Sequence, residues 1–128
     1  MELVSDRDVP AGGFAERVAG VPGASVRIVH LHGHGFNFEL LQYRTPAGAG
    51  RAREPNDTGS AHLCFVADDL DAEAERLRSK GVSFRSPGPV TIVGGPNDGG
   101  KGIYVEDPDG NAVEVIELAR PWPTGGAA

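Results

Sequence analysis

Hydrophobic and polar residues alternate most regularly in the second half of the chain, where the pattern predicts one helix flanked by strands. The helix is expected over residues 69–80, because Leu70, Ala74 and Leu77 fall on one face of it. Short β-rich runs surround this helix, at residues 61–66, 82–84, 90–93, 102–105 and 112–118. For residues 60–118 we expect the element order β-α-β-β-β, which has one strand fewer than these five β-rich runs.

The first half of the chain predicts a hairpin preceded by less regular structure. Residues 24–31 and 36–43 have strand character, and the sequence His-Gly-His-Gly over residues 32–35 is typical of a turn. Leu3-Val4 is a short strand candidate. Residues 10–20 predict a weak helix or an irregular turn, because two adjacent glycines oppose helical order.

Proline, glycine and arginine concentrate between the two halves, which predicts a linker there. We expect an N-terminal module over residues 1–46, a linker over 47–59, a C-terminal module over 60–120 and a tail over 121–128.

The two halves are related by a weak internal repeat. A shift of 75 residues aligns residues 38–43 with residues 113–118, so that Glu39 coincides with Glu114, each among apolar neighbours. The same shift places the counterpart of His62 ahead of the first residue. The first module is therefore expected to lack its opening strand and most of its helix.

Composition narrows the classes of function. Hydrophobic residues make up 39% and charged residues 23%, as expected of a folded globular protein. The net charge of −6 offers no basic surface to nucleic acid, and no apolar run is long enough to span a membrane. Neither nucleic acid nor a membrane is therefore expected as a partner. The only cysteine, Cys64, excludes an internal disulfide and fits a reducing cytoplasm.

Three segments resemble the vicinal oxygen chelate superfamily. They are Ser-Ala-His-Leu-Cys-Phe-Val-Ala-Asp-Asp-Leu-Asp at residues 60–71, Asp-Pro-Asp-Gly-Asn-Ala-Val-Glu at 107–114, and Phe-Glu-Leu-Leu-Gln-Tyr at 38–43. The superfamily includes glyoxalase I, methylmalonyl-CoA epimerase, extradiol dioxygenases, and fosfomycin and bleomycin resistance proteins. The resemblance covers about residues 24–118. It implies an α+β fold, in which paired βαβββ modules form a curved mixed sheet around a cleft, with the first module incomplete.

The resemblance also implies one divalent metal ion, of Zn, Ni, Co, Mn or Fe, bound by Glu39, His62 and Glu114. The fourth ligand of the family, usually His or Gln on the first strand, has no counterpart in this sequence. A single strand glutamate is often just an exposed residue, and a single histidine is often a core residue. The expectation of a metal site rests on finding Glu39, His62 and Glu114 together at the positions that the family uses as ligands.

Other patterns are weaker candidates for a site. His30, His32 and His34 would share one face of a strand, but the neighbouring glycines favour a turn, so we expect an exposed set that binds metal only adventitiously. Residues 94–101 superficially resemble a phosphate loop, yet no helix follows and no Ser or Thr follows the lysine. Cys64 shows no sign of activation, and packing is the default expectation for it.

The function implied by the resemblance is an enzyme of the lactoylglutathione lyase or epimerase type. Glu114, with Glu39 as second choice, would remove a proton next to a carbonyl of a small oxygenated substrate, and the metal would stabilise the resulting enediolate. Tyr43, Tyr104 and Lys101 are the candidates for substrate binding.

Two alternative functions stay open. A metal-free antibiotic-binding and resistance protein would hold its ligand by stacking, on Tyr43, Phe65, Tyr104 and Trp122. An extradiol-type dioxygenase would need a further acid/base residue that the sequence does not assign. Whichever function applies, the sheet edge left open in the first module predicts a homodimer.

Overall fold

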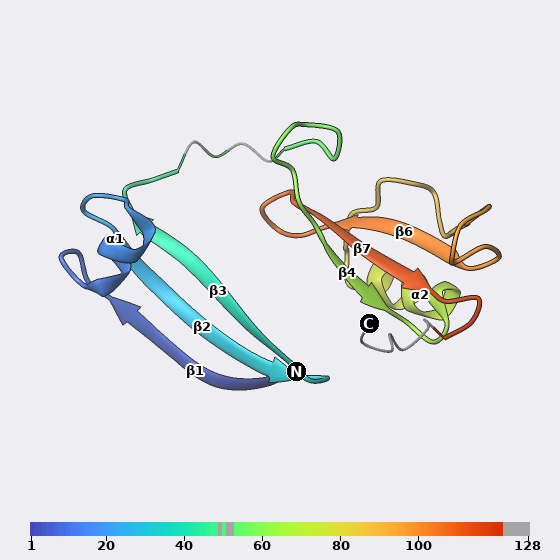
Figure 1. Cartoon of the computed structure of the whole chain (residues 1–128), viewed down its shortest axis with the longest axis horizontal. Coiled ribbons are helices and arrows are strands. Elements are labelled where there is room, and N and C mark those ends of the chain that lie inside the picture. Colours follow the sequence, from blue (N-terminus) through green and yellow to red (C-terminus); the bar gives the residue numbers. More distant parts are fainter. Residues whose placement is uncertain (49, 51–52, 122–128) are drawn as a thin grey trace, which may run out of the picture. The chain divides into compact units, whose positions relative to one another are not determined.

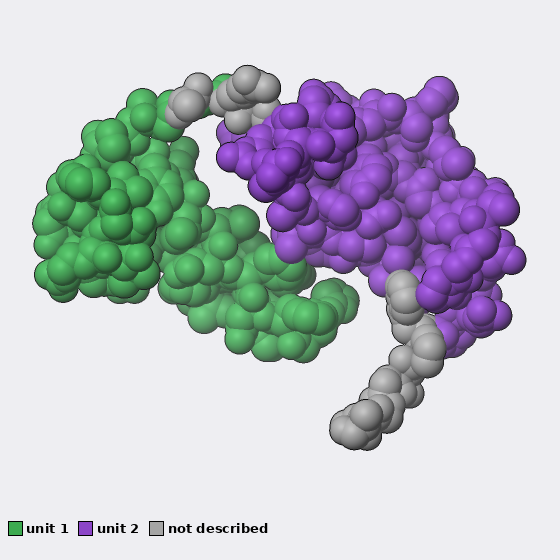
Figure 2. Space-filling view, turned by 45° about the horizontal axis from the view of Figure 1, so that its top comes forward, with its two compact units in different colours: residues 1–51 green, residues 52–128 purple. Residues whose placement is uncertain are grey.

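The structure, a computed structural model, describes residues 1–48, 50 and 53–121. The chain divides into two compact units, Met1–Arg51 and Ala52–Ala128, which we call unit 1 and unit 2 (Figure 2). Each unit has its own sheet and its own apolar core. The predicted α+β class is confirmed. Within the described ranges, no helix is long and apolar enough to cross a membrane.

Unit 1 is a three-stranded antiparallel sheet in the order β1-β2-β3, with one short helix (Figure 1). Its elements are β1 (Glu2–Val9), α1 (Phe14–Ala19), β2 (Ser25–Gly33) and β3 (Phe36–Thr45). The helix contributes a core residue to a cluster with β1, β2 and the loop before β2, made of Val9, Ala15, Ala24, Val26 and Ile28. This cluster lies toward the end of the sheet where β1 finishes.

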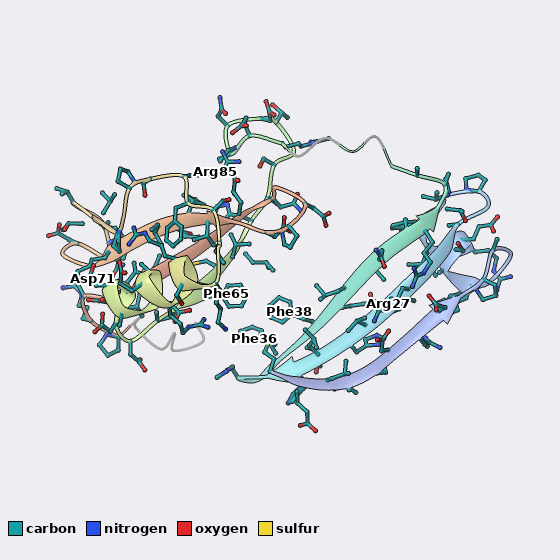
Figure 3. All side chains as sticks on the ribbon, turned by 180° about the vertical axis from the view of Figure 1, so that it is seen from behind. Arg27, Phe36, Phe38, Phe65, Asp71 and Arg85 are labelled. Carbon is teal, nitrogen blue, oxygen red and sulfur yellow. The ribbon has the colours of Figure 1, made fainter. Side chains whose placement is uncertain are left out.

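Strand β1 is longer than the two-residue candidate that the sequence predicts. One face of the strand carries charged residues whose partners lie on other strands. Asp6 binds Arg27 of β2 (labelled in Figure 3) at 2.5 Å, and Asp8 binds Arg44 of β3 at 3.0 Å. Cross-strand charge pairs support a sheet as apolar pairs do, but they leave no hydrophobic alternation in the sequence.

The turn between β2 and β3 is tighter than predicted. It consists of His34 and Gly35, with φ angles of 53° and 77°, as a primed two-residue hairpin turn requires. The expected hairpin is confirmed, but its turn has two residues, and His32 and Gly33 belong to β2. As a result, His30 and His32 belong to β2 and lie on the same face of it.

Unit 2 has the predicted β-α-β-β-β order (Figure 1). The elements are β4 (Leu63–Val66), α2 (Leu70–Ser79), β5 (Val90–Thr91), β6 (Lys101–Glu106) and β7 (Ala112–Glu117). The sheet order is β4-β7-β6-β5, with β4 parallel to β7 and the other pairs antiparallel. The predicted strand at 82–84 is reduced to an isolated bridge between Phe84 and Val105.

Two carboxylates fix the start of α2. The side chain of Asp69 accepts a hydrogen bond from the Ala72 amide at 2.9 Å, as an N-cap residue does. Glu117, at the end of β7, accepts a hydrogen bond from the Leu70 amide at 2.8 Å. Negative charge at a helix N-terminus is stabilising, and the Glu117 contact also ties the start of α2 to the sheet.

The core of unit 2 lies on one face of the sheet, beneath α2. Leu70 is completely buried and packs with Ile103 and Val115. Because side chains alternate along a strand, Tyr104 and Glu114 project from the opposite face. The helix therefore covers one face and leaves the other for polar side chains.

The two units share a hairpin, as the internal repeat predicts. The β2-β3 pair corresponds to β6-β7, and the shorter β5 occupies the place that β1 has in unit 1. In the described part of unit 1, no element corresponds to β4 or α2.

Candidate functional site

A group of polar side chains lies on the face of the unit 2 sheet opposite α2. Glu114 on β7 lies beside Tyr104 of β6 and beside Cys64 of β4 in the strand register. His62 directly precedes β4, and its Nε2 atom lies 3.2 Å from Glu114 Oε2. The same nitrogen lies 3.2 Å from the hydroxyl oxygen of Tyr104. We call these four residues the polar cluster.

Tyr104 also fixes the orientation of the His62 ring. The two rings meet edge to face, with centroids 5.1 Å apart and an interplanar angle of 84°. The parallel pairing of β4 with β7 carries His62 toward Glu114, since Leu63 pairs with Val113 and Cys64 with Glu114. Local strand register therefore brings together two residues that are 52 positions apart in the sequence.

Burial, followed by the carboxylate of Glu114, sets the electrostatics of the polar cluster. Partial burial and then the neighbouring Glu114 charge raise the pKa of Cys64 to about 11. The same two causes, in the same order, raise the pKa of Tyr104 above its ordinary value. Both groups remain protonated at neutral pH, so Cys64 is not an activated thiolate. Cys64 is exposed rather than packed, in contrast to the default expectation.

His62 and Glu114 fit a divalent metal ion by donor type and by spacing. Two ligand atoms at about 2.1 Å from one ion lie about 3.0–3.4 Å apart for bond angles of about 90–109°. The 3.2 Å between His62 Nε2 and Glu114 Oε2 falls in this range. The two side chains are 37% and 26% exposed, which leaves room for water or substrate. Across the described residues, however, no group of three or more His, Cys, Asp or Glu side chains is arranged to hold a metal.

The other predicted ligand, Glu39, lies on β3 of unit 1. Its Oε1 atom is 3.2 Å from Nε2 of His30, its cross-strand neighbour on β2. Tyr43 lies further along β3, opposite Val26, and is partly exposed. Trp122 is outside the described residues.

Lys101, predicted to bind substrate, lies on the α2 face of the unit 2 sheet. Its Nζ atom is 2.7 Å from Asp71 on α2 and 3.5 Å from Glu117. Lys101 therefore projects from the face opposite Tyr104, and the structure does not bring it to the polar cluster.

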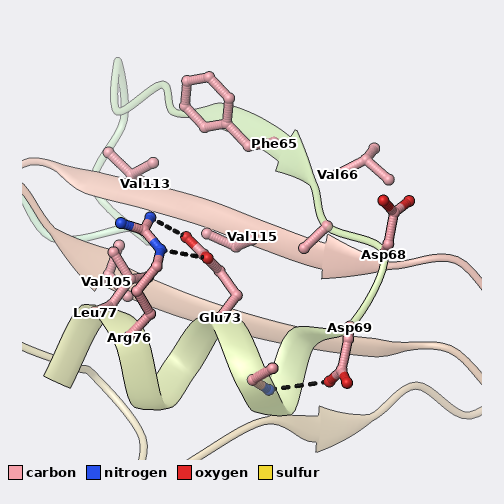
Figure 4. A pocket seen from close by; sticks show the side chains of 12 residues that line it. Phe65, Val66, Asp68, Asp69, Glu73, Arg76, Leu77, Val105, Val113 and Val115 are labelled. Carbon is pink, nitrogen blue, oxygen red and sulfur yellow. Dashed lines mark hydrogen bonds and ion pairs between the residues drawn. The ribbon is translucent and has the colours of Figure 1, made fainter. Parts of the chain in front are cut away.

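An open pocket of about 670 Å³ lies beside α2 (Figure 4). Because side chains alternate along β7, its lining is on the other face of the sheet from the polar cluster. Phe65 lines it, together with Val113 and Val115. Its charged lining residues include Glu73 and Arg76, which bind each other (Figure 4). The lining is otherwise mainly apolar, so the candidate chemistry lies with the polar cluster rather than in this pocket.

Sequence reasoning predicted His62, Glu114 and Tyr104 as candidate site residues, and the structure places them together, but sequence reasoning missed how they interact. The contact of Tyr104 with His62 depends on strand order, which residue spacing does not reveal. Sequence reasoning also missed the pairing of His30 with Glu39. The alternation of His30 and His32 was a usable signal, but it was assigned to a turn.

Residues 1–115 match the family model described as the Glyoxalase/Bleomycin resistance protein/Dioxygenase superfamily. The chain is 35% identical over 102 residues to a 2-epi-5-epi-valiolone epimerase from Actinomyces sp, a match that covers 78% of this chain and 55% of that protein. It is 40% identical over 68 residues to a lactoylglutathione lyase from Salmonella typhimurium, covering 50% of this chain and 46% of that protein. The chain spans about half the length of the curated relatives it matches.

The fold is also similar to that of a solved structure, a glyoxalase family protein from Bacillus cereus. The TM-score is 0.73 at 21% sequence identity, over 91% of this chain and 77% of that chain. Together with the family match, which covers most of the chain, this similarity agrees with the βαβββ order of unit 2 and with the repeated hairpin. The chain belongs to the Glyoxalase/Bleomycin resistance protein/Dioxygenase superfamily.

Proposed function

We propose that the protein is a metal-dependent lyase or isomerase that removes a proton next to a carbonyl of a small oxygenated substrate. The observation that carries this proposal is the approach of His62 Nε2 to Glu114 Oε2, at 3.2 Å, on a face of the sheet that α2 leaves uncovered. Family membership supports it, because relatives of this chain include an epimerase and a lactoylglutathione lyase.

In this proposal, His62 and Glu114 hold one divalent ion of Zn, Ni, Co, Mn or Fe. When bound, the ion supplies Lewis-acid stabilisation of the negative charge that develops on the substrate oxygen. Glu114 is also the base, since a carboxylate has two oxygens and one can bind the ion while the other accepts the proton. Return of this proton to the substrate completes an isomerisation.

The ring of Tyr104 positions His62 by its edge-to-face contact, and because the pKa of Tyr104 is raised, its hydroxyl stays a hydrogen-bond donor at neutral pH. A neutral phenol beside the reacting carbon can donate to a substrate oxygen. Glu39 is also proposed as a metal ligand, because it occupies the repeat position of Glu114 and pairs with a histidine at the same separation. Tyr43 keeps its proposed role in substrate binding, whereas Lys101 does not, because it pairs with Asp71 and Glu117 on the α2 face of the sheet.

Proton exchange with solvent tests this function without knowledge of the natural substrate. The metal-supplied protein is incubated in deuterated water with small α-hydroxy ketones and 2-oxo acids, and loss of the proton signal next to the carbonyl is followed by NMR. Glu114→Gln should slow the exchange by about 100-fold or more, the usual contribution of a general base. The matched control is Glu75→Gln, on an exposed position of α2, and it should exchange like wild type. Exchange that is equal in both variants would refute the assigned base.

We also propose that the protein forms a homodimer. β3 is an edge strand of the unit 1 sheet, and Phe36, Leu40 and Leu41 on it are about half exposed or more. Exposed apolar edge strands favour pairing with another chain. A molar mass of one chain by light scattering would exclude the dimer. A cytoplasmic location is proposed as well, because Cys64 is a free thiol.

A further inference from the structure

His62 lies outside the strand ladder that carries the rest of the polar cluster. The other three members belong to β4, β6 and β7, whereas β4 and its pairing with β7 begin only at Leu63. The ladder therefore fixes the backbone on one side of His62. On the other side, the position of His62 depends on residues 53–61, which we call the leading segment.

The leading segment is folded into successive turns. The amide of Asp57 donates a hydrogen bond to the carbonyl oxygen of Glu54 at 2.9 Å, and the amide of Ser60 donates to the carbonyl oxygen of Asp57 at 3.0 Å. The side chain of Asp57 also accepts a hydrogen bond from the Glu54 amide at 3.0 Å. Only one residue separates Ser60 from His62. Because the turns follow one another without a break, a displacement of Glu54 is passed on to the start of β4.

Arg85, labelled in Figure 3, binds the far end of the leading segment. Its Nη1 atom donates to Glu54 at 2.5 Å, and its Nη2 atom lies 3.1 Å from Glu106 at the end of β6. Because Glu54 is 65% exposed, this ion pair contributes little to stability. Among the described residues, Arg85 Nε is buried without a hydrogen-bond partner, which lowers the net gain further. The planar fork of the guanidinium nevertheless restricts where Glu54 can lie.

The backbone of Arg85 is attached to the strand that carries Tyr104. The Arg85 amide donates a hydrogen bond to the Tyr104 carbonyl oxygen at 3.0 Å, next to the bridge between Phe84 and Val105. On β6, Tyr104 meets the His62 ring edge to face. The contacts therefore form a closed ring, which runs through Arg85 and the leading segment and returns to Tyr104 through the His62 ring.

We propose that Arg85 and Glu54 are positioning residues, which set the place of the His62 ring within the polar cluster. They act through the leading segment, and all the residues concerned belong to unit 2. The consequence for metal binding rests on the proposed function, because the same placement brings His62, as a ligand, to Glu114.

The test compares Glu54→Gln with the matched control Glu75→Gln. Both carboxylates lie 2.5 Å from an arginine nitrogen, and both side chains are largely exposed, at 65% and 75%. Glu75 pairs with Arg78 within α2, so its loss leaves the leading segment untouched. In the metal-free full chain, NMR cross-relaxation between the ring protons of His62 and Tyr104 reports their contact. Calorimetric titration with Co²⁺ measures metal affinity, and circular dichroism verifies the fold of each variant.

We expect Glu54→Gln to weaken the cross-relaxation between the two rings and to lower Co²⁺ affinity by about 2- to 5-fold, as loss of an exposed ion pair implies. Glu75→Gln should match the wild type in both measurements. In the double variant of Glu54→Gln with Arg85→Gln, the effect should equal that of Arg85→Gln alone, because both changes break the same contact. Unchanged cross-relaxation in Glu54→Gln, or additive effects in the double variant, would overturn the inference.

The inference and the proposed function fail in distinguishable ways, because the cross-relaxation is measured without metal. If the wild-type chain binds no Co²⁺ while Glu54→Gln alone weakens the ring contact, the proposed function is wrong and the positioning role stands. If Co²⁺ binding is lost in Glu114→Ala but both measurements agree between Glu54→Gln and Glu75→Gln, the positioning role is refuted and the proposed function stands.

Discussion

Truncation of Leu70 tests whether the small core beneath α2 holds the sheet that carries the polar cluster. Leu70 is 0% exposed and packs with Ile103 and Val115. Leu70→Ala removes three carbons, which at about 0.8 kcal/mol each corresponds to about 2.4 kcal/mol of transfer free energy. The remaining cavity adds roughly 0.5–1 kcal/mol after partial relaxation, so the expected loss is about 3 kcal/mol, within the range for such substitutions.

The loss is measured by urea unfolding followed by far-ultraviolet circular dichroism. The matched control is Leu63→Ala, the same chemical change at a residue of β4 that is 50% exposed. About half of the transfer term and no cavity term apply there, so about 1 kcal/mol is expected. A loss of about 3 kcal/mol is a large part of the stability of a small domain. If the two variants were equally stable, Leu70 would not be the centre of the unit 2 core.

Three further predictions concern α2 and the polar cluster. Asp69→Ala should cost about 1 kcal/mol in the same unfolding assay, because it removes the N-cap of α2, and an unchanged midpoint would contradict this. Tyr104→Phe keeps the ring beside His62 but removes the hydroxyl contact on Nε2, the nitrogen that would bind the ion. Metal affinity measured by calorimetry should therefore rise by about 2- to 10-fold, and a loss of affinity would mean that Tyr104 itself is a ligand. In metal-free protein at neutral pH, Cys64 should react slowly with iodoacetamide because its pKa is about 11, and Glu114→Gln should speed the reaction by lowering that pKa. A fast wild-type reaction would contradict this.

The second half of the fold could be predicted from the sequence because its signals are local. The helix has a capping aspartate, a one-sided apolar pattern and a glycine after its end, and the structure places α2 at Leu70–Ser79. The turn before β7 is rich in Asp, Pro, Gly and Asn. The alignment of Glu39 with Glu114 also identified the repeated hairpin correctly.

Strand β1 could not be predicted in full, because its partners are charges on other strands. Asp6 and Asp8 look like loop residues until Arg27 and Arg44 are seen beside them. The hairpin turn was predicted at the right place but too long, since a two-residue turn requires a positive φ angle at His34, which is uncommon outside glycine.

The contacts of the candidate site also depend on register. Lys101 and Tyr104 are close in sequence but project from opposite faces of β6, and no residue pattern alone shows which face α2 covers. The contact of Ser5 with His30 requires a bulge that spacing does not reveal.

The central claim is that His62 and Glu114 bind a divalent metal ion. It is tested most directly by elemental analysis of tag-free protein that has been supplied with Zn, Ni and Co and then freed of loosely bound metal. Wild-type protein and the control Glu75→Ala are predicted to retain one ion per chain, and Glu114→Ala is predicted to lose it. Retention of the ion by Glu114→Ala, or the absence of any ion from the wild-type chain, would contradict the account.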